Sequence, residues 1–237
     1  MSTIPFPPPP APGSGGSEVA LESVATGHGG AVVVPVEIAH PAPLDRRRRL
    51  GILTNIVGAH SVVDYYSFII VSLMPLLAAR LDLTNQQKAM VLGIGSIMSG
   101  FLQPVVAWIG DKHDSRAIAW IGLVVASIAC SAVGLADGFW MLLLISAIGA
   151  AGVGVFHPPA AAVVGQLSGS RRSLGVSLFF LTGMAGGMAG NVLTPYVVRW
   201  LGAFAGGQGD AGLTLGLQWQ CVLILPGLLV AALLARA

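Results

Sequence analysis

The sequence predicts an all-α membrane protein in which six transmembrane helices form a three-plus-three inverted repeat. Hydrophobic residues make up 54% of the 237 residues and charged residues only 9%, whereas a soluble domain carries about a quarter charged residues. Six apolar segments each approach the roughly 20 residues that a spanning helix needs. The net charge of +2 is too small to indicate a nucleic-acid partner, so we expect the lipid bilayer as the main surrounding.

The first 45 residues differ in composition from the rest of the chain. A proline run at residues 7–10 is followed by Gly-Ser repeats, and such a composition cannot bury enough apolar area to order itself. We therefore expect residues 1–45 to be a disordered cytoplasmic tail and residues 46–237 to be the helical bundle. No charged stretch precedes an apolar one at the start, so we expect no secretory signal.

The six apolar segments follow one another with short connections. Pro104 near the end of the second segment and Pro195 in the fifth predict kinks, which membrane helices tolerate. The segments are Leu50–Ala79, Gln87–Gly110, Ala117–Ala136, Gly138–Val164, Ser173–Leu201 and Leu213–Leu234.

The distribution of basic residues predicts the orientation in the membrane. With the N-terminus inside, nine of the twelve Lys and Arg residues fall on the cytoplasmic side and three outside, in agreement with the positive-inside rule. We expect both termini to be cytoplasmic. The inner set is Arg46, Arg47, Arg48, Arg49, Lys112, Arg116, Arg171, Arg172 and Arg236, and the outer set is Arg80, Lys88 and Arg199.

The second and fifth segments share a pattern of small residues. Gly93, Met98 and Gly100 recur ninety positions later as Gly183, Met188 and Gly190. The recurrence predicts that the two helices are equivalent members of a repeat, an arrangement typical of secondary transporters; chance similarity between two glycine-rich helices is the alternative. Glycines four residues apart in the fifth segment predict close packing against a neighbouring helix.

Asp64 is an acidic residue inside the first apolar segment. A charge at membrane depth is costly, so it usually serves a proton, an ion or a substrate. His60 lies four residues earlier and therefore shares its helix face. A carboxylate beside an imidazole can exchange a proton near physiological pH, as a proton-coupled pump requires. The alternative is a hydrogen bond that anchors one helix to another.

His157 precedes two prolines, Pro158 and Pro159, in the fourth segment. Because proline removes backbone donors, the imidazole could face a cavity and contact a substrate or relay a proton, or it could cap a broken helix end. Cys130 and Cys221 lie in separate apolar segments and are interpreted as small core residues. The spans carry no HExxH, GxSxG or paired carboxylates, so we expect neither an enzyme nor a cofactor or metal site.

The loop after the second segment carries Asp111, Lys112 and Arg116. The simplest interpretation is a solvated turn with positive-inside charge. The string that enters this loop from residue 103 resembles the signature loop of the major facilitator superfamily, although Ala107 and Asp114 stand where that motif has glycine. The resemblance implies that the acid acts as a latch, which binds a neighbouring helix end in one conformation and releases it in the other.

Four motifs in order resemble the fosmidomycin resistance protein family of drug exporters: His60-x-x-x-Asp64, Gln103-Pro104-Val105-Val106, Phe156-His157-Pro158, and the glycine-rich helix after Arg171-Arg172. The resemblance covers residues 51–237. It implies proton-driven antiport of small molecules such as drugs across the inner membrane of a bacterial cell, with the imidazoles, the carboxylate and the glutamine of these motifs on the substrate or proton pathway. Pro159 and Ala162 stand where that family often has an acid and an arginine, which leaves the substrate open.

Members of that family resemble twelve-helix proteins whose binding site lies between two halves. This chain has six apolar segments, so we expect either a truncated product that lacks the second half or a pair of copies, and we favour truncation. The alternative function is a non-transporting membrane protein that associates with another membrane partner.

Overall fold

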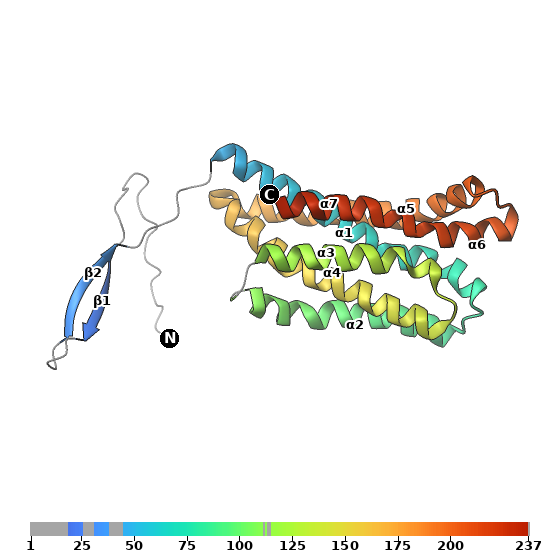
Figure 1. Ribbon diagram of the computed structural model, residues 1–237, viewed down its shortest axis with the longest axis horizontal. Helices are drawn as coiled ribbons and strands as arrows, with labels where there is room; N and C mark the ends of the chain where they lie inside the picture. The colour runs from blue at the N-terminus through green and yellow to red at the C-terminus, as the bar shows by residue number, and fades with distance from the viewer. Residues whose placement is uncertain (1–18, 26–30, 38–44, 111, 113–114, 237) are drawn as a thin grey trace, which may run out of the picture. The chain divides into compact units, whose positions relative to one another are not determined.

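The tail contains a pair of strands that the sequence analysis does not anticipate. The structure, a computed structural model, describes residues 19–25, 31–37, 45–110, 112 and 115–236, and it divides into units 1–45 and 46–237. In the first unit, β1 (Val19–Ala25) pairs antiparallel with β2 (Ala31–Glu37) (Figure 1). β2 is rich in valine, which favours extended backbone, and the disorder expected of the tail as a whole stays a prediction. The rest of the tail, residues 1–18, 26–30 and 38–44, lies outside the described residues.

The second unit is the helical bundle that the sequence predicts. Its described residues contain six helical spans that are long and apolar enough to cross a membrane. The helices are α1 (Arg46–Arg80), α2 (Asn85–Gly110), α3 (Ser115–Ser131), α4 (Phe139–Leu167), α5 (Arg172–Phe204), α6 (Gly209–Trp219) and α7 (Ile224–Arg236). Short 3₁₀ turns follow α3 at Val133–Leu135 and α4 at Gly169–Arg171.

The sixth span is interrupted, although its sequence predicts one continuous helix. A 3₁₀ turn at Gln220–Leu223 separates α6 from α7. Pro226 is the third residue of α7. A proline fits best in the first turn of a helix, where its missing N–H would have no partner in any case, and the new helix begins two residues before the proline.

The helices pack in the crossed manner expected of two inverted triplets. The first triplet consists of α1, α2 and α3, and the second of α4, α5 and the interrupted span α6–α7. The first helix of each triplet packs on the second helix of the other: α1 packs on α5, and α4 packs on α2 (Figure 1). The third helix of the first triplet, α3, packs on α4 and α7. This arrangement confirms the predicted fold class.

Glycines of α5 form the closest part of its contact with α1. A methyl group added to Gly186 would lie 2.0 Å from the carbonyl oxygen of Ser61, and one on Gly190 would lie 2.3 Å from that of Tyr65. The predicted packing role of these glycines is confirmed. The matching positions in α2 differ, because among the described residues nothing lies within 4 Å of a methyl added to Gly93. The sequence repeat therefore does not extend to equivalent packing.

Two clusters of buried apolar side chains fill the bundle, and α1 contributes to both. Val63 belongs to one cluster and Tyr66 to the other, and the Tyr66 hydroxyl donates a hydrogen bond to the Leu223 carbonyl. Asp64 stands between them in sequence, 18 residues after the first residue of α1 and 16 before the last. These separations correspond to about 27 and 24 Å of helix, so the carboxylate lies near the middle of α1.

Candidate functional site

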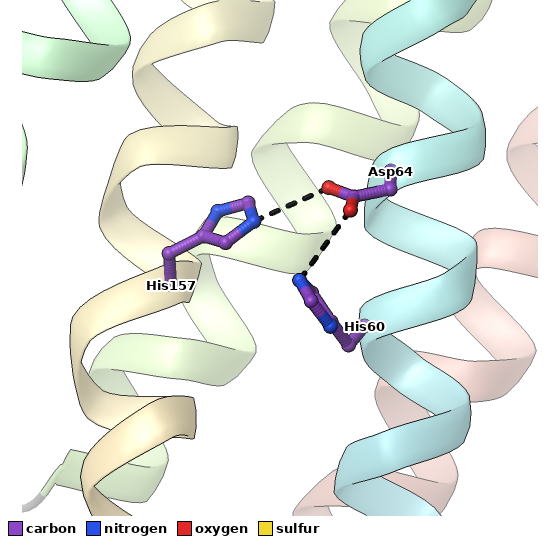
Figure 2. Close-up of side chains that lie close together, drawn as sticks. All are labelled: His60, Asp64 and His157. Atoms are coloured by element: carbon purple, nitrogen blue, oxygen red, sulfur yellow. Dashed lines mark ion pairs between the residues drawn. The ribbon is translucent and has the colours of Figure 1, made fainter. Parts of the chain in front are cut away.

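The carboxylate of Asp64 lies between two imidazoles. Its Oδ2 is 3.4 Å from Nε2 of His60, and its Oδ1 is 3.2 Å from Nε2 of His157 (Figure 2). The first contact joins residues four apart on α1, as the sequence predicts, and the second joins α1 to α4. The structure thus brings together three of the predicted site residues, and each carboxylate oxygen has its own imidazole partner.

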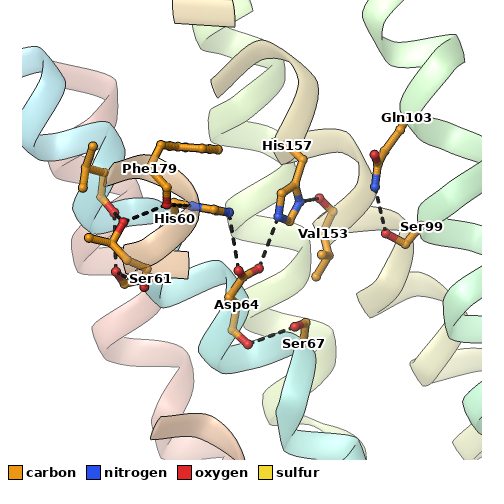
Figure 3. Close-up of polar contacts among 11 residues, drawn as sticks. His60, Ser61, Asp64, Ser67, Ser99, Gln103, Val153, His157 and Phe179 are labelled. Carbon is orange, nitrogen blue, oxygen red and sulfur yellow. Dashed lines mark hydrogen bonds and ion pairs between the residues drawn. The ribbon is translucent and has the colours of Figure 1, made fainter. Parts of the chain in front are cut away.

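His60 is held firmly in place. Its side chain is almost fully buried, and its ring stacks on Phe179 of α5 with the ring centroids 3.7 Å apart and the planes 6° from parallel. Its Nδ1 lies 2.7 Å from the Phe179 carbonyl oxygen (Figure 3). Because a carbonyl oxygen only accepts hydrogen bonds, this Nδ1 carries a hydrogen. His60 therefore also anchors α1 to α5, as the alternative interpretation of its role requires.

His157 is held by its own helix. Its Nδ1 lies 2.7 Å from the carbonyl oxygen of Val153, one turn earlier in α4, and by the same argument this Nδ1 is a donor. The helix continues unbroken through Pro158 and Pro159. The structure therefore gives His157 no broken helix end to cap, and it places the imidazole on the carboxylate instead.

The two Nδ1 contacts determine which atoms remain for exchange. Since each Nδ1 donates to a backbone carbonyl, only the two Nε2 atoms and the carboxylate can take up or release protons at this site. A hydrogen bond between an Nε2 and a carboxylate oxygen needs one hydrogen between them. The site can accordingly hold two exchangeable protons, one between His60 and Asp64 and one between His157 and Asp64.

Gly183 of α5 leaves the space that the site occupies. A methyl group on this residue would lie 2.3 Å from Cε1 of His60 and 2.5 Å from Oδ2 of Asp64. The sequence analysis assigns this glycine only a packing role, and it gives Phe179 no role. The regular spacing of glycines in α5 is a signal that could have indicated the role of Gly183, whereas no motif indicates a role for Phe179.

The site borders two neighbouring cavities. One, of about 430 Å³, is lined by residues of α2, α4 and α5 that include His157, and the other, of about 390 Å³, reaches α1 and α3 and includes several serines. Gly100 and Gln103 line both. Gln103 thus lies on the cavity wall, where its amide contacts Ser99 at 3.5 Å. His157 lines the first of these cavities, and since 21% of its side chain is exposed, that cavity has access to the site.

The structure describes only part of the predicted latch loop. Asp111 lies outside the described residues. Lys112 is exposed, and its ammonium lies 3.7 Å from the centre of the Trp108 ring. Arg116, also exposed, lines a pocket with Ile52 of α1. The latch role of Asp111, Lys112 and Arg116 therefore stays a prediction.

A bundle of membrane-length helices with an ionisable cluster near its middle is typical of secondary transporters. The family model described as Major Facilitator Superfamily matches residues 56–237, and the chain belongs to this family. It is a multi-pass membrane protein. Members of the family are transporters rather than enzymes, as the sequence analysis expects for this chain.

Two bacterial relatives are similar over most of the bundle. The fosmidomycin resistance protein of Escherichia coli (strain K12) is 30% identical over 164 residues, which are 69% of this chain and 40% of that protein. The uncharacterized MFS-type transporter YfnC of Bacillus subtilis (strain 168) is 25% identical over 150 residues, or 63% of this chain and 37% of that protein. The chain spans about two-fifths of the length of these curated relatives.

Solved transporter structures share the fold. A bacterial homologue of the human drug peptide transporters PepT1 and PepT2 matches with a TM-score of 0.67 and 18% identity over 80% of this chain and 41% of that chain. Tetrameric PepTSo2 matches with a TM-score of 0.66 and 18% identity over 79% of this chain and 41% of that chain. At such low identity the likeness concerns the fold alone.

Proposed function

We propose that this chain is the N-terminal half of a proton-coupled exporter of small molecules that works by alternating access. In this proposal the protein lies in the inner membrane with both termini in the cytoplasm, and Asp64 binds the coupled proton. The observation that carries the proposal is the carboxylate of Asp64 near the middle of α1, in contact with two imidazoles. The family assignment favours transport over the alternative of a non-transporting membrane partner.

The proton acts through the contact between α1 and α4. When the hydrogen between Asp64 and His157 leaves, lone pairs of nitrogen and oxygen face each other at 3.2 Å, and the contact no longer attracts. The contact with His60 lies within α1, so its loss moves no helix relative to another. Protonation therefore holds α4 against α1, and deprotonation releases it, which couples proton release to a change in the bundle.

The substrate binds in the cavities beside His60, Asp64 and His157. Its binding site has a second wall, which these six helices do not supply. Transporters of this architecture bind substrate between two six-helix halves. We extend the proposal accordingly: transport requires a second half or a second copy of the chain. Gln103, which lines both cavities, contacts the substrate.

Drug resistance tests the proposal with fosmidomycin as the probe, since a relative's name refers to it. A fosmidomycin-sensitive bacterium that produces the chain, alone or together with the C-terminal half of a relative, is expected to become resistant. In everted vesicles, the drug is expected to discharge a pH gradient reported by a fluorescent dye. Asp64→Asn keeps the shape of the side chain but cannot exchange a proton at this position, so both effects should disappear while the amount of protein in the membrane stays the same.

Gly93→Ala is the matched control, because nothing lies within 4 Å of the added methyl among the described residues. It should keep full resistance. Undiminished resistance in Asp64→Asn would remove the carboxylate from the mechanism. Absence of resistance from the unaltered chain, alone and with a C-terminal half of a relative, would refute fosmidomycin export.

A further inference from the structure

Three side chains that are common metal ligands converge at one point of the bundle. His60, Asp64 and His157 each offer one ligand atom, and these atoms all lie within 4.8 Å of one another. No metal site is expected from the sequence, because the spans carry no metal-binding motif and His157 stands 93 positions after Asp64. We propose that these three residues form a reversible binding site for a divalent first-row transition ion such as Zn²⁺ or Co²⁺.

The spacing of the ligand atoms already resembles that of a loaded site. With metal–ligand distances of about 2.0–2.1 Å, two ligand atoms of a tetrahedral ion are about 3.4 Å apart. The two nitrogen–oxygen separations here are 3.4 and 3.2 Å. These two separations involve different oxygens of the carboxylate. Since one ligand atom from each residue lies within 4.8 Å of the other two, no pair has to close by more than about 1.4 Å to reach the spacing of a tetrahedral ion.

The outer contacts of both imidazoles are those of metal-bound histidines. A ligating histidine usually donates its other ring N–H to a carbonyl or carboxylate, which sets the tautomer and directs the free nitrogen at the metal. His60 does so with the Phe179 carbonyl, and His157 does so with the Val153 carbonyl. In the neutral ring, each Nε2 therefore presents its lone pair to the same space beside Asp64.

The ligand set selects the class of ion. Two imidazole nitrogens and one carboxylate suit Zn²⁺, Co²⁺, Ni²⁺ or Cu²⁺, whereas Mg²⁺ and Ca²⁺ prefer oxygen ligands. Three protein ligands leave a position open, a feature of sites where a water or a substrate completes the coordination. His157 lines the cavity of about 430 Å³, so this position is accessible and the ion can exchange.

The inference concerns binding and does not depend on proton-coupled export. An ion and a proton exclude each other on the same Nε2, because that atom has a single lone pair. A chain that binds the ion without exporting a drug would refute the proposed function alone. A chain that exports fosmidomycin with protons but binds no ion would refute this inference alone.

The test is a titration of the full chain with Co²⁺, whose visible spectrum reports its coordination geometry. The chain is purified in detergent with a tag that contains no histidine, and His28, His40 and His113 are replaced by Gln so that other imidazoles do not contribute. We expect one bound Co²⁺ per chain, with the intense visible bands of a four-coordinate ion, and no equivalent binding of Mg²⁺.

Four variants in that background identify the ligands. Asp64→Asn and His157→Gln should each weaken Co²⁺ binding at least about tenfold, and Gly93→Ala should leave it unchanged. His157→Cys should restore binding and add a thiolate-to-cobalt charge-transfer band, which a purely structural role of His157 would not produce. Each variant is compared at equal helix content and monodispersity.

Three results would overturn the inference. These are no Co²⁺ binding by the background chain, equal affinity in the background and in both His157→Gln and Asp64→Asn, or binding by His157→Cys without a sulfur band. Because His157 is partly exposed and its ring is anchored within its own helix, its replacement leaves a folded chain in which these results can be read.

Discussion

His60 and His157 contact the same carboxylate but are held very differently. The first is 1% exposed, is stacked on Phe179 and is bonded to another helix. The second has 21% of its side chain exposed and is bonded within α4. His60 therefore belongs to the framework of the bundle as well as to the site, whereas His157 is the partner that can leave the carboxylate.

This difference predicts separate effects on stability and transport. His60→Ala should destabilise the bundle by about 2–3 kcal/mol, because it leaves a cavity and removes a buried hydrogen bond. His157→Ala should change the free energy of unfolding by less than about 1 kcal/mol, since its side chain is partly exposed, yet it should abolish fosmidomycin resistance.

Thermal unfolding in detergent, followed by intrinsic fluorescence, measures the first effect, and drug resistance measures the second. The pattern predicted for His157, loss of function with nearly unchanged melting, distinguishes a transport role from a structural one. Equal loss of melting temperature in His60→Ala and His157→Ala would show that the two imidazoles are structural to the same degree.

At this scale the sequence predicts one half of the site. A spacing of four residues places His60 beside Asp64 on any α-helix, so that contact follows from local geometry alone. The contact with His157 depends on how α4 is rotated and shifted against α1, and packing along both helices determines this. For that reason the sequence does not decide whether His157 relays a proton or caps a helix end.

At the scale of elements, the contact between α1 and α5 differs from what the repeat leads one to expect. Gly183, Gly186 and Gly190 all lie against α1, whereas Gly93 in the equivalent helix faces open space in the described structure. The same pattern of glycines therefore gives close helix packing in α5 but not at Gly93 of α2. Hydropathy predicts the existence of helices well, but it does not say which neighbour a small residue meets.

Gly186 gives the sharpest test of this contact. Because the methyl group of an alanine would lie 2.0 Å from a backbone oxygen of α1, no side-chain rotation can relieve the clash and the two helices must separate. Gly186→Ala should lower the stability of the bundle by about 1–3 kcal/mol, seen as a reduced melting temperature.

Gly93→Ala again serves as the control, and its melting temperature should stay the same or rise slightly, because alanine favours helix more than glycine does. If Gly186→Ala melted at the temperature of the unaltered chain, α5 would not lie as close to α1 as the structure places it.

The helix ends show where sequence reasoning stops. The six spans are found with errors of a few residues, because a long apolar segment in a bilayer must satisfy its backbone hydrogen bonds internally. Hydropathy alone predicts one helix across the break between α6 and α7, and only Pro226 indicates that a new helix begins there. The hairpin of β1 and β2 does not follow from the composition of the whole tail, because its valine-rich run is short.

For the whole molecule, the orientation in the membrane is a prediction that rests on the basic residues alone. Nine basic residues fall at one end of the spans and three at the other, and positive charge is retained in the cytoplasm. If this holds, the turn before α2 faces outward and the turn before α5 faces inward. Gln86 and Ser170 are exposed residues in or beside these turns, and each can be replaced by Cys as a reporter.

In a chain whose own thiols are removed by Cys130→Ala and Cys221→Ser, a membrane-impermeant maleimide should label Gln86→Cys in intact cells. It should label Ser170→Cys only after the cells are opened. The reverse pattern would place the arginines of the α1 start outside. It would refute the orientation that the positive-inside rule predicts for this chain.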